Sequence, residues 1–297
     1  MHTTPATRRF FKMQGAGNDF VVLDLRQGDP APDPALCRFL ADRRFGVGCD
    51  QILTIEAPVD PGSLAAYRIW NADGSRSGQC GNGARCIAHY LYRHDRLAVD
   101  RFTLDSPAGP IDAHVVGPGR YALDMGRPRF EPSAIGLVLP GAAPTVPSDP
   151  YRIELNGESV SFGAVSMGNP HAVLVVDAVA HAPVERLGPA IQASGVFRDG
   201  VNVGFVEPVS ASAVRLRVFE RGVGETLACG SAACAAVAVL ARRGLVGADV
   251  AVHLPGGVLD IAWSAADDGG VIMTGPAAFV FEGELCRNES ALAASSP

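Results

Sequence analysis

Two cysteines stand at the head of glycine-rich segments that each lead into an apolar, helix-like pattern. Cys80 precedes Gly81-Asn82-Gly83, and Cys229 precedes Gly230-Ser231. Apolar residues behind Cys80 recur at i, i+3, i+4 and i+7, which predicts a helix that begins at Gly81. The first-turn N–H groups of a helix attract anions, so such a start could lower the pKa of a neighbouring thiol and bind a substrate carboxylate. The plainer interpretation is a turn that contains a buried cysteine.

The two cysteine segments belong to a wider internal repeat. Cys80 and Cys229 are 149 positions apart, and two further pairs keep nearly the same spacing. Asn18 matches Asn169 and Gln51 matches Asn202, each at 151 positions. Polar positions that stay in step over half a chain predict two copies of one domain. Chance similarity between glycine-rich turns is the alternative.

Length and composition predict a globular protein with two cores. The chain has 297 residues, of which 47% are hydrophobic and 19% charged. A net charge of -6 without basic runs argues against nucleic acid or a membrane as partner, and favours a small molecule. No apolar run is long enough to span a bilayer, and the first nine residues are too polar for a signal peptide. We therefore expect a cytoplasmic protein.

The cysteines and the lysine narrow the possible cofactors. Seven cysteines, an odd number, indicate reduced thiols, and their spacing lacks the pattern of a zinc site. Lys12 is the only lysine in the sequence, so pyridoxal phosphate chemistry would depend on one residue. The lone Gly15-Ala-Gly17 turn has no third glycine and opens no helix, which excludes a Rossmann site. We expect neither a metal nor a cofactor.

Hydrophobic periodicity and turn signals predict mixed α/β structure in both halves. Asp33-Pro34 predicts a helix that runs to about Arg44, and Asn156-Gly157 predicts a two-residue hairpin turn. The helix expected over 230–243 is apolar on all sides, so sheet should enclose it. Six prolines between Arg127 and Pro150 indicate an inter-domain connection. Strands are expected near 10–13, 20–23, 52–55, 67–70, 102–104, 111–116, 121–123, 151–155, 160–165, 172–176, 201–206 and 214–218.

Two thiols offered by matching halves suit two-base chemistry at a stereocentre. One thiolate removes a proton from one face of a carbon while the other thiol returns a proton to the opposite face, so the configuration inverts. The exchange of roles in the reverse reaction fits a substrate whose two isomers are near mirror images. Without pyridoxal, helix-terminal N–H groups would have to stabilise the negative charge that develops.

Four motifs resemble those of the diaminopimelate epimerases. They are Lys12 to Phe20 (KMQGAGNDF), Asn71 to Gly83 with its Asp-Gly-Ser and Cys-Gly-Asn-Gly, Gly168-Asn-Pro-His171, and Glu220 to Gly230 (ERGVGETLACG). The resemblance covers essentially the whole chain. It implies an α/β fold of two pseudo-symmetric domains, each a barrel-like, mostly antiparallel sheet around a central helix. The expected halves are 1–126, with a C-terminal return at 276–297, and 127–275.

By this resemblance the protein is an epimerase of LL- and meso-2,6-diaminopimelate that works without a cofactor in lysine and cell-wall precursor biosynthesis. Cys229 would take the proton from the LL isomer and Cys80 would deliver one, while His171 and Glu220 tune the thiols. The residues implied to bind substrate through side chains are Asn18, Gln51, Asn71, Asn169, Asn202, Glu220 and Arg221. Those implied to bind it through the backbone are Gly81, Asn82, Gly230 and Ser231.

Two positions depart from the family pattern. Ser231-Ala232 stands where Thr-Gly is common, and Phe281 replaces a tyrosine associated with a homodimer contact. Ser231 keeps an N–H and a hydroxyl, so substrate binding should survive.

Three other functions remain open from the sequence. A proline or hydroxyproline racemase-like enzyme would share the fold and the cysteine pair. A thiol hydrolase or transferase would use one cysteine with His171, and a non-catalytic binding module would use neither.

Overall fold

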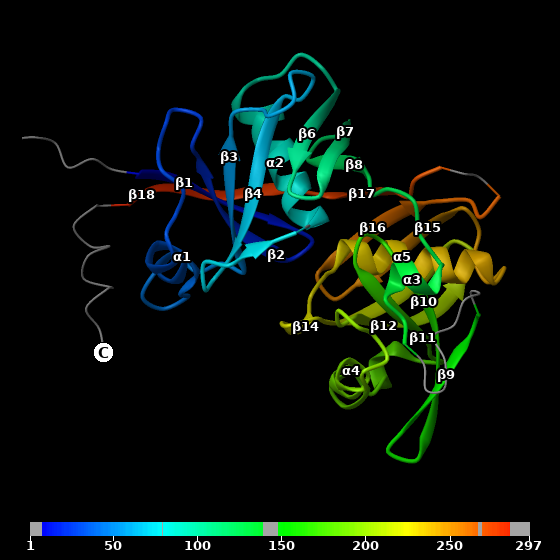
Figure 1. Cartoon of the computed structure of the whole chain (residues 1–297). Helices are drawn as coiled ribbons and strands as arrows, with labels where there is room; N and C mark the ends of the chain where they lie inside the picture. Colours follow the sequence, from blue (N-terminus) through cyan, green and yellow to red (C-terminus); the bar gives the residue numbers. More distant parts are fainter. Residues whose placement is uncertain (1–7, 79, 139–147, 267–268, 286–297) are drawn as a thin grey trace, which may run out of the picture. The chain divides into compact units, whose positions relative to one another are not determined.

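The computed structural model describes residues 8–78, 80–138, 148–266 and 269–285, and its contacts divide the chain into two compact units (Figure 1). Unit 1 comprises Met1–Leu123 with Pro276–Pro297, and unit 2 comprises Asp124–Gly275. Each unit is described by itself.

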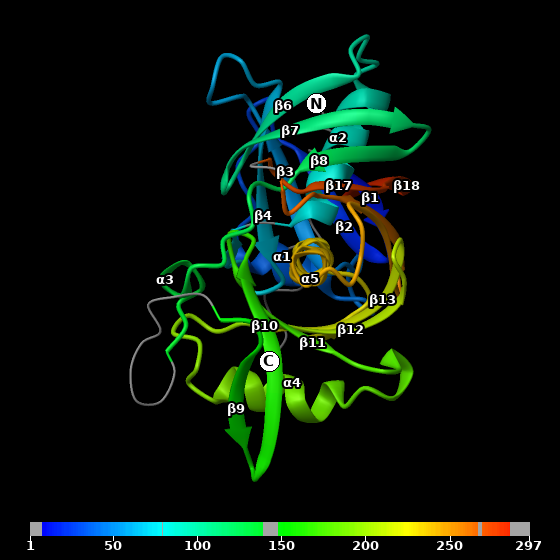
Figure 2. The ribbon, with the colours of Figure 1, turned by 90° about the vertical axis from the view of Figure 1, so that its right-hand side faces the viewer.

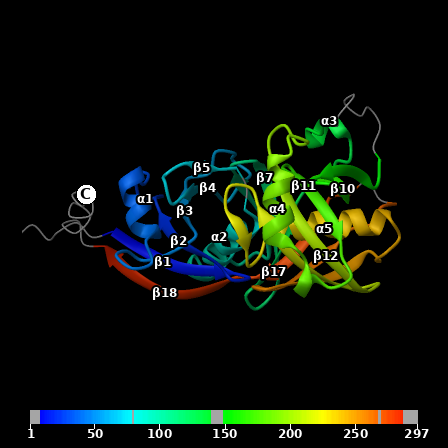
Figure 3. The same cartoon turned by 90° about the horizontal axis from the view of Figure 1, so that it is seen from below.

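Unit 1 is a curved sheet with one helix on each face. Its helices are α1 (Pro34–Ala41) and α2 (Gly81–His94). Strand β2 runs parallel to β3, β4 runs parallel to β6, and the other neighbouring strands are antiparallel. The last strand, β18, returns to pair with β1 along one side of the unit (Figure 3). The strands are β1 (Arg8–Gly15), β2 (Asn18–Asp24), β3 (Gln51–Glu56), β4 (Ala65–Asn71), β5 (Arg76–Ser77), β6 (Arg101–Ser106), β7 (Gly109–Gly117), β8 (Arg120–Asp124) and β18 (Ala278–Leu285).

The first eleven residues of α2, Gly81 to Leu91, are all buried, so this helix is the core of unit 1. Its aromatic side chains pack on the strands, with the Tyr90 ring 5.0 Å from Phe11 and the His89 ring 5.0 Å from Phe279. Gly83 allows close approach to β3, since a Cβ there would lie 3.1 Å from a methyl of Leu53. The opposite face of the sheet packs against α1 through Cys37 and Leu40.

Unit 2 repeats this arrangement. Its helices are the short α3 (Pro132–Ile135), the 3₁₀ turn η1 (Val179–His181), α4 (Val184–Ala193) and α5 (Gly230–Arg242). Helix α5 lies inside the sheet and α4 packs on its outer face. The strands are β9 (Tyr151–Leu155), β10 (Glu158–Ser166), β11 (Pro170–Val175), β12 (Asn202–Ser210), β13 (Ala213–Glu220), β14 (Gly224–Thr226), β15 (Asp249–Leu254), β16 (Gly257–Ala262) and β17 (Ile272–Pro276).

Strand pairing shows that the two units are copies of one design. In unit 1 the parallel pair β2 and β3 aligns Phe20 with Gln51, and in unit 2 the parallel pair β11 and β12 aligns His171 with Asn202. Both residues of the second pair lie 151 positions after those of the first. A second parallel pair follows in each unit, β4 with β6 and β13 with β15. The predicted pseudo-symmetric α/β fold is confirmed.

Helix α5 is enclosed as its sequence predicted. Ten of its residues are buried, and all of these are Gly, Ala, Cys, Val or Leu. Figure 2, in which α5 is seen along its axis, shows β12 and β13 curving around it. Gly244, the second residue after the helix, has φ +70°. An achiral residue adopts this left-handed conformation without steric cost.

Two local predictions have different outcomes. The hairpin turn is confirmed, since Asn156 and Gly157 both have positive φ, 53° and 83°, and join β9 to β10. The helix expected to reach Arg44 ends at Ala41 instead. Asp42 leaves the helix with ψ 120°, and its carboxylate accepts the N–H groups of Arg44 and Phe45. This local capping competes with a further helical turn.

Candidate active site

The Cys80 thiol lies at the N-cap of α2. The residue is extended, with φ -148° and ψ 108°, and its sulfur accepts the N–H of Gly83 at 3.4 Å. The side chain is half-buried. The Gly81 and Asn82 N–H groups belong to the first helical turn, where intrahelical acceptors are lacking, so the predicted helix start is present.

The Cys80 thiol contacts a pair of asparagines in the same unit. Its Sγ donates to Asn18 Oδ1 at 3.5 Å, and the Asn82 amide donates to the same oxygen at 3.3 Å. Asn82 is 2% exposed, so its side chain is part of the protein interior. Asn18, Cys80 and Asn82, all predicted site residues, therefore form one hydrogen-bonded cluster.

A partly exposed charge network holds Asn18 from the side opposite the thiol. Asn18 Nδ2 donates to Asp50 at 2.8 Å, and Arg43 bridges Asp50 and Asp19 with contacts of 2.7 Å to each. Lys12 Nζ completes the network at 2.6 Å from Asp19. Burial alone would raise the pKa of Asp19, but hydrogen bonds from Arg43 and Lys12 outweigh it and lower that pKa. The only lysine is thus engaged in an ion pair.

The other predicted polar residues of unit 1 lie on neighbouring strands. Gln51 on β3 and Asn71 on β4 are directly opposite each other, and the Gln51 amide donates to Asn71 Oδ1 at 2.9 Å. Asn71 in turn donates to the Ser75 hydroxyl at 3.0 Å. Side chains of residues opposite one another in a sheet project to the same face, which explains how two distant sequence positions meet.

Cys229 occupies the matching position at the N-cap of α5. It is extended like Cys80, with φ -126° and ψ 113°, and its sulfur lies 3.5 Å from the Ser231 hydroxyl. The expectation that the helix start lowers the pKa is wrong for this thiol, which is only 6% exposed. Burial raises the pKa of Cys229 well above its usual value, and the charge of Glu220 raises it further. The Ser231 hydroxyl offsets only part of this effect.

His171 is fully buried beside the same helix start. Its Nε2 lies 3.0 Å from Asn169 Oδ1, and the Asn169 amide donates to Ser231 at 3.5 Å. Because the asparagine oxygen is an acceptor, Nε2 carries the proton, and Nδ1 has no hydrogen-bond partner among the described residues. Burial, together with the charge of Arg221, lowers the pKa of His171 to about 3, so the imidazole is neutral.

Glu220 and Arg221 lie at the end of β13. The Thr226 hydroxyl donates to Glu220 at 2.5 Å, and the Arg221 N–H donates to Asn202 Oδ1 at 2.8 Å. The Arg221 guanidinium also bonds the Asp199 carbonyl. Gly200, with φ +73°, makes room for this side chain, since a Cβ there would lie 2.7 Å from Arg221 Cδ. The side chain of Arg221 is nevertheless exposed and accessible to an anion.

The predicted site residues are divided between the two units. Asn18, Gln51, Asn71, Cys80, Gly81 and Asn82 belong to unit 1, and Asn169, His171, Asn202, Glu220, Arg221, Cys229, Gly230 and Ser231 belong to unit 2. Sequence reasoning missed the residues that orient them: Lys12, Asp19, Arg43, Asp50, Arg85 and Thr226. Asp19, Asp50 and Arg85 each stand within three positions of a predicted site residue, and this closeness in sequence could have identified them.

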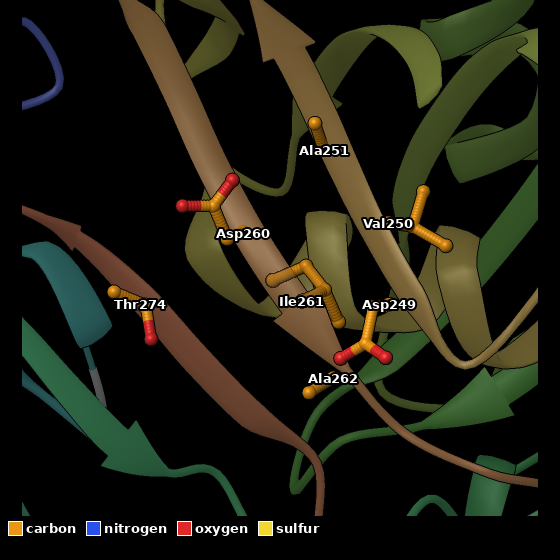
Figure 4. Close-up of a pocket in the computed structure, with 7 residues that line it drawn as sticks. All are labelled: Asp249, Val250, Ala251, Asp260, Ile261, Ala262 and Thr274. Carbon is orange, nitrogen blue, oxygen red and sulfur yellow. The ribbon is translucent and has the colours of Figure 1, made fainter. Parts of the chain in front are cut away.

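A hollow of about 330 Å³ lies elsewhere in unit 2 (Figure 4). Residues of β15 and β16 line it together with Thr274, and it contains neither cysteine. Two of its side chains, Asp249 and Asp260, are carboxylates, which do not suit an anionic substrate. Within the described ranges no group of three or more His, Cys, Asp or Glu could hold a metal ion. In the same residues no helix has the length and apolarity needed to cross a membrane.

Comparison with solved structures shows the class of fold. A hydroxyproline epimerase from Agrobacterium vitis matches with a TM-score of 0.66 at 15% identity, covering 95% of this chain and 93% of its own. A probable proline racemase from Agrobacterium radiobacter matches with a TM-score of 0.69 at 14% identity, covering 94% and 93%. The fold is therefore one found in amino-acid epimerases and racemases.

Sequence comparison shows the family. The family model described as diaminopimelate epimerase matches residues 10–131 and 163–280. The diaminopimelate epimerase of Xanthomonas euvesicatoria is 58% identical over 279 residues, 94% of this chain and 96% of the relative. That of Xylella fastidiosa strain M12 is 55% identical over 275 residues, 92% and 95% of the two chains. The chain belongs to the diaminopimelate epimerase family and is an isomerase.

Proposed function

We propose that this protein interconverts LL- and meso-2,6-diaminopimelate without a cofactor, with Cys80 and Cys229 as its two acid–base groups. The observation that supports the cysteine assignment is the equivalence of the two thiols. Each is the extended N-cap residue of the buried helix at the centre of its unit. In this proposal the two units are the two halves of one epimerase, and both thiols act on the same α-carbon.

In the LL-to-meso direction Cys229 is the base. Its thiol is held neutral by burial and by the charge of Glu220. The substrate ammonium, bound by Glu220, offsets that charge and so favours the thiolate that removes the α-proton. Thr226 keeps the Glu220 carboxylate in place through its hydrogen bond. Neutral His171 fixes Asn169, which in turn contacts Ser231 beside the thiol.

Cys80 then delivers a proton to the opposite face of the carbanion. The charge that develops on the substrate carboxylate is stabilised by backbone N–H groups at the two helix starts, Gly81-Asn82 on α2 and Gly230-Ser231 on α5. These donors are held by the helices and need no reorganisation during the reaction. The reverse reaction uses the same groups with the roles of the thiols exchanged.

The distal end of diaminopimelate carries a second ammonium and a second carboxylate. Arg221, whose guanidinium is exposed beside the site, binds this carboxylate. The side chains that complete recognition are Asn18, Gln51, Asn71, Asn169 and Asn202. A site in which Arg221 pairs with the distal carboxylate discriminates against amino acids that lack this carboxylate, because the polar groups of the site would be left without partners.

The test replaces each proposed catalytic cysteine in turn. Cys80→Ala and Cys229→Ala should each lower turnover of LL-diaminopimelate at least about 10³-fold, since one turnover needs both thiols. Formation of the meso isomer, followed by chiral chromatography without added cofactor, measures the reaction. Cys49→Ala is the matched control, because Cys49 is buried and burial raises its pKa to about 12.

Near wild-type epimerisation in either catalytic variant would contradict the two-base mechanism. Comparable wild-type rates for proline and diaminopimelate would reassign the substrate instead, so the two parts of the proposal fail separately.

The proposal includes a cytoplasmic homodimer. Phe281 on β18 is 49% exposed and stacks edge-on against Phe10 at 6.1 Å, while its neighbour Val280 is 55% exposed. Apolar side chains exposed together on an edge strand favour association with a second copy. Sedimentation should show a dimer that Phe281→Asp dissociates. A wild-type monomer at micromolar concentration would refute this part.

A further inference from the structure

A directed chain of side-chain hydrogen bonds in unit 1 runs between two charged residues and passes the Cys80 thiol. Arg85 Nη2 donates to Asn82 Oδ1 at 2.7 Å. Asn82 Nδ2 donates to Asn18 Oδ1 at 3.3 Å, and Asn18 Nδ2 donates to Asp50 Oδ2 at 2.8 Å. Three consecutive bonds thus connect a guanidinium to a carboxylate through two amides.

The charged ends fix the direction of this chain. A guanidinium has only donors and an ionised carboxylate has only acceptors, whereas an amide can present either side. Reversing Asn82 would turn its NH2 group toward the guanidinium of Arg85, and reversing Asn18 would turn its oxygen toward the carboxylate of Asp50. Both amides are therefore held one way round, with the Asn18 oxygen directed inward.

Cys80 is attached to the middle of the chain. Its sulfur lies 3.5 Å from Asn18 Oδ1, the same oxygen that accepts from Asn82. A thiol can donate to this oxygen, but a thiolate cannot and is repelled by it. The fixed direction of the amides thus favours the protonated thiol, while the Gly83 N–H, 3.4 Å away, favours the thiolate.

Arg85 can fix the direction of the amide chain because its guanidinium is shielded from water and cannot exchange its hydrogen-bond partners for solvent. Its side chain is 0% exposed and also donates to the Pro276 carbonyl at 3.2 Å. Gly15 leaves room for it, since a Cβ there would lie 3.5 Å from the guanidinium and 3.3 Å from the Asn82 carbonyl. Asp50, at the other end, is held by Arg43.

We propose that Arg85 and Asp50 are positioning residues for proton transfer at Cys80: they fix the direction of the Asn82–Asn18 amide chain so that the thiol faces a hydrogen-bond acceptor and stays protonated until it delivers its proton. The proposal depends on the function proposed for Cys80. Neither residue is required to touch substrate.

Two other titratable groups near Cys80, Tyr67 and Cys86, do not explain why its thiol would stay protonated. Tyr67 on β4 and Cys86 on α2 both interact electrostatically with Cys80. Burial raises the pKa of each of them, so both remain neutral where Cys80 would ionise. Among the described residues, the charged groups joined to this hydrogen-bond chain include Arg85 from α2 and, from the network beside β2, Asp50, Arg43, Asp19 and Lys12.

The test measures the ionisation of Cys80 directly, by the rate of its alkylation with iodoacetamide as a function of pH. Trypsin cleaves after Arg76 and Arg85, so the wild-type peptide 77–85 contains Cys80 as its only cysteine. Asp50→Ala removes the acceptor end of the chain and Arg85→Met removes the donor end while keeping a similar stem. In Arg85→Met the peptide extends to Arg93, and fragmentation distinguishes Cys80 from Cys86.

Both variants should move the alkylation midpoint of Cys80 to lower pH by about half a unit to one unit, the effect of losing one hydrogen bond to the neutral thiol. Arg85→Lys should recover part of the wild-type midpoint, because an ammonium can still donate to Asn82. Asp95→Ala is the matched control. Asp95 is also a partly buried aspartate paired with an arginine, 2.6 Å from Arg26, at the other end of α2.

An unchanged or raised midpoint in Asp50→Ala, where the side chain is 45% exposed, would overturn the proposal even if Arg85→Met failed to fold. The alkylation midpoint does not depend on epimerase activity. Failure of the two-cysteine mechanism would appear instead in the Cys80→Ala and Cys229→Ala turnover, so the two outcomes are distinguishable.

Discussion

At the scale of single residues, the two equivalent cysteines have different surroundings. Cys80 is half-buried and contacts the Asn18 amide, whereas Cys229 is 6% exposed and lies near the Glu220 carboxylate. Burial and the negative charge both disfavour the Cys229 thiolate. The surroundings of the two thiols therefore differ even though the fold repeats.

This asymmetry predicts the effect of Glu220→Gln. Removing the negative charge should lower the pKa of Cys229 by up to about one unit, and so accelerate its alkylation by up to about tenfold near pH 8. Peptide mapping after timed exposure to iodoacetamide measures the rate at each cysteine. Thr226→Val, which removes a hydrogen bond to Glu220 but no charge, is the control. A slower rate or no change in Glu220→Gln would contradict the electrostatic argument.

Sequence patterns could predict which residues carry the chemistry but not how they are oriented. Cys80, Asn18 and Asn82 were recognisable because motifs contain them, and they do lie together. The burial of Arg85 was not predictable, since an arginine on a helix is usually exposed. Nor was the raised pKa of Cys229, because desolvation depends on the whole tertiary environment rather than on the helix start alone.

At the scale of secondary structure, local signals predicted the starts of α1, α2 and α5 and the hairpin turn at Asn156-Gly157. Asp33 caps α1 as expected, with its carboxylate accepting the Leu36 N–H at 2.8 Å. Helix α2 begins at Gly81 and α5 at Gly230, directly after each cysteine. Local sequence patterns could not predict which strands pair, because pairings such as β4 with β6 join segments separated by a whole helix. They became predictable only through the repeat and the family resemblance.

The contact between α4 and β13 predicts a stability effect at Gly188. A Cβ at this position would lie 2.5 Å from Phe219 Cγ, much closer than a normal contact. Alanine favours a helix over glycine by about 1 kcal/mol, but overpacking costs about 1–3 kcal/mol. Gly188→Ala should therefore lower the free energy of unfolding, as measured by urea denaturation.

Two further variants test the cause of that loss. Gly188→Ala combined with Phe219→Ala should be less destabilised than the sum of the single changes, because alanine lacks the Cγ and Cδ1 atoms that would meet the new methyl. Gly247→Ala, where a Cβ meets only the Ala211 carbonyl at 3.5 Å, should change stability by less than about 0.5 kcal/mol. Additive effects of the first two substitutions would rule out the contact with Phe219 as the cause.

At the scale of the whole molecule, two buried histidines predict a loss of stability in mild acid. Burial lowers the pKa of His171 to about 3 and that of His89 to about 4, below the value of about 6.5 in an unfolded chain. Between these values the unfolded state binds more protons than the folded state. Stability is therefore complete above about pH 6.5 and falls as the pH drops toward 4, by up to about 1.4 kcal/mol per pH unit for each histidine.

Urea denaturation at pH 7.5, 6 and 5 checks this expectation. His89→Gln, in a residue outside the proposed site that contacts the Tyr121 hydroxyl at 2.7 Å, should reduce the slope of stability against pH. His253→Gln controls for the loss of an exposed imidazole. Equal slopes in wild type and His89→Gln would show that His89 ionises alike in the folded and unfolded states.

The pairing of β1 with β18 has a consequence for how the protein is made. Strand β1 lies between β2 and β18, so the sheet around α2 gains its last strand only from residues Ala278–Leu285. During translation these residues leave the ribosome after every residue of unit 2. We therefore expect unit 2 to fold on the nascent chain while β1 in unit 1 still has an unpaired edge. If translation stalls before β18 emerges, unit 2 should be the folded half of the nascent chain.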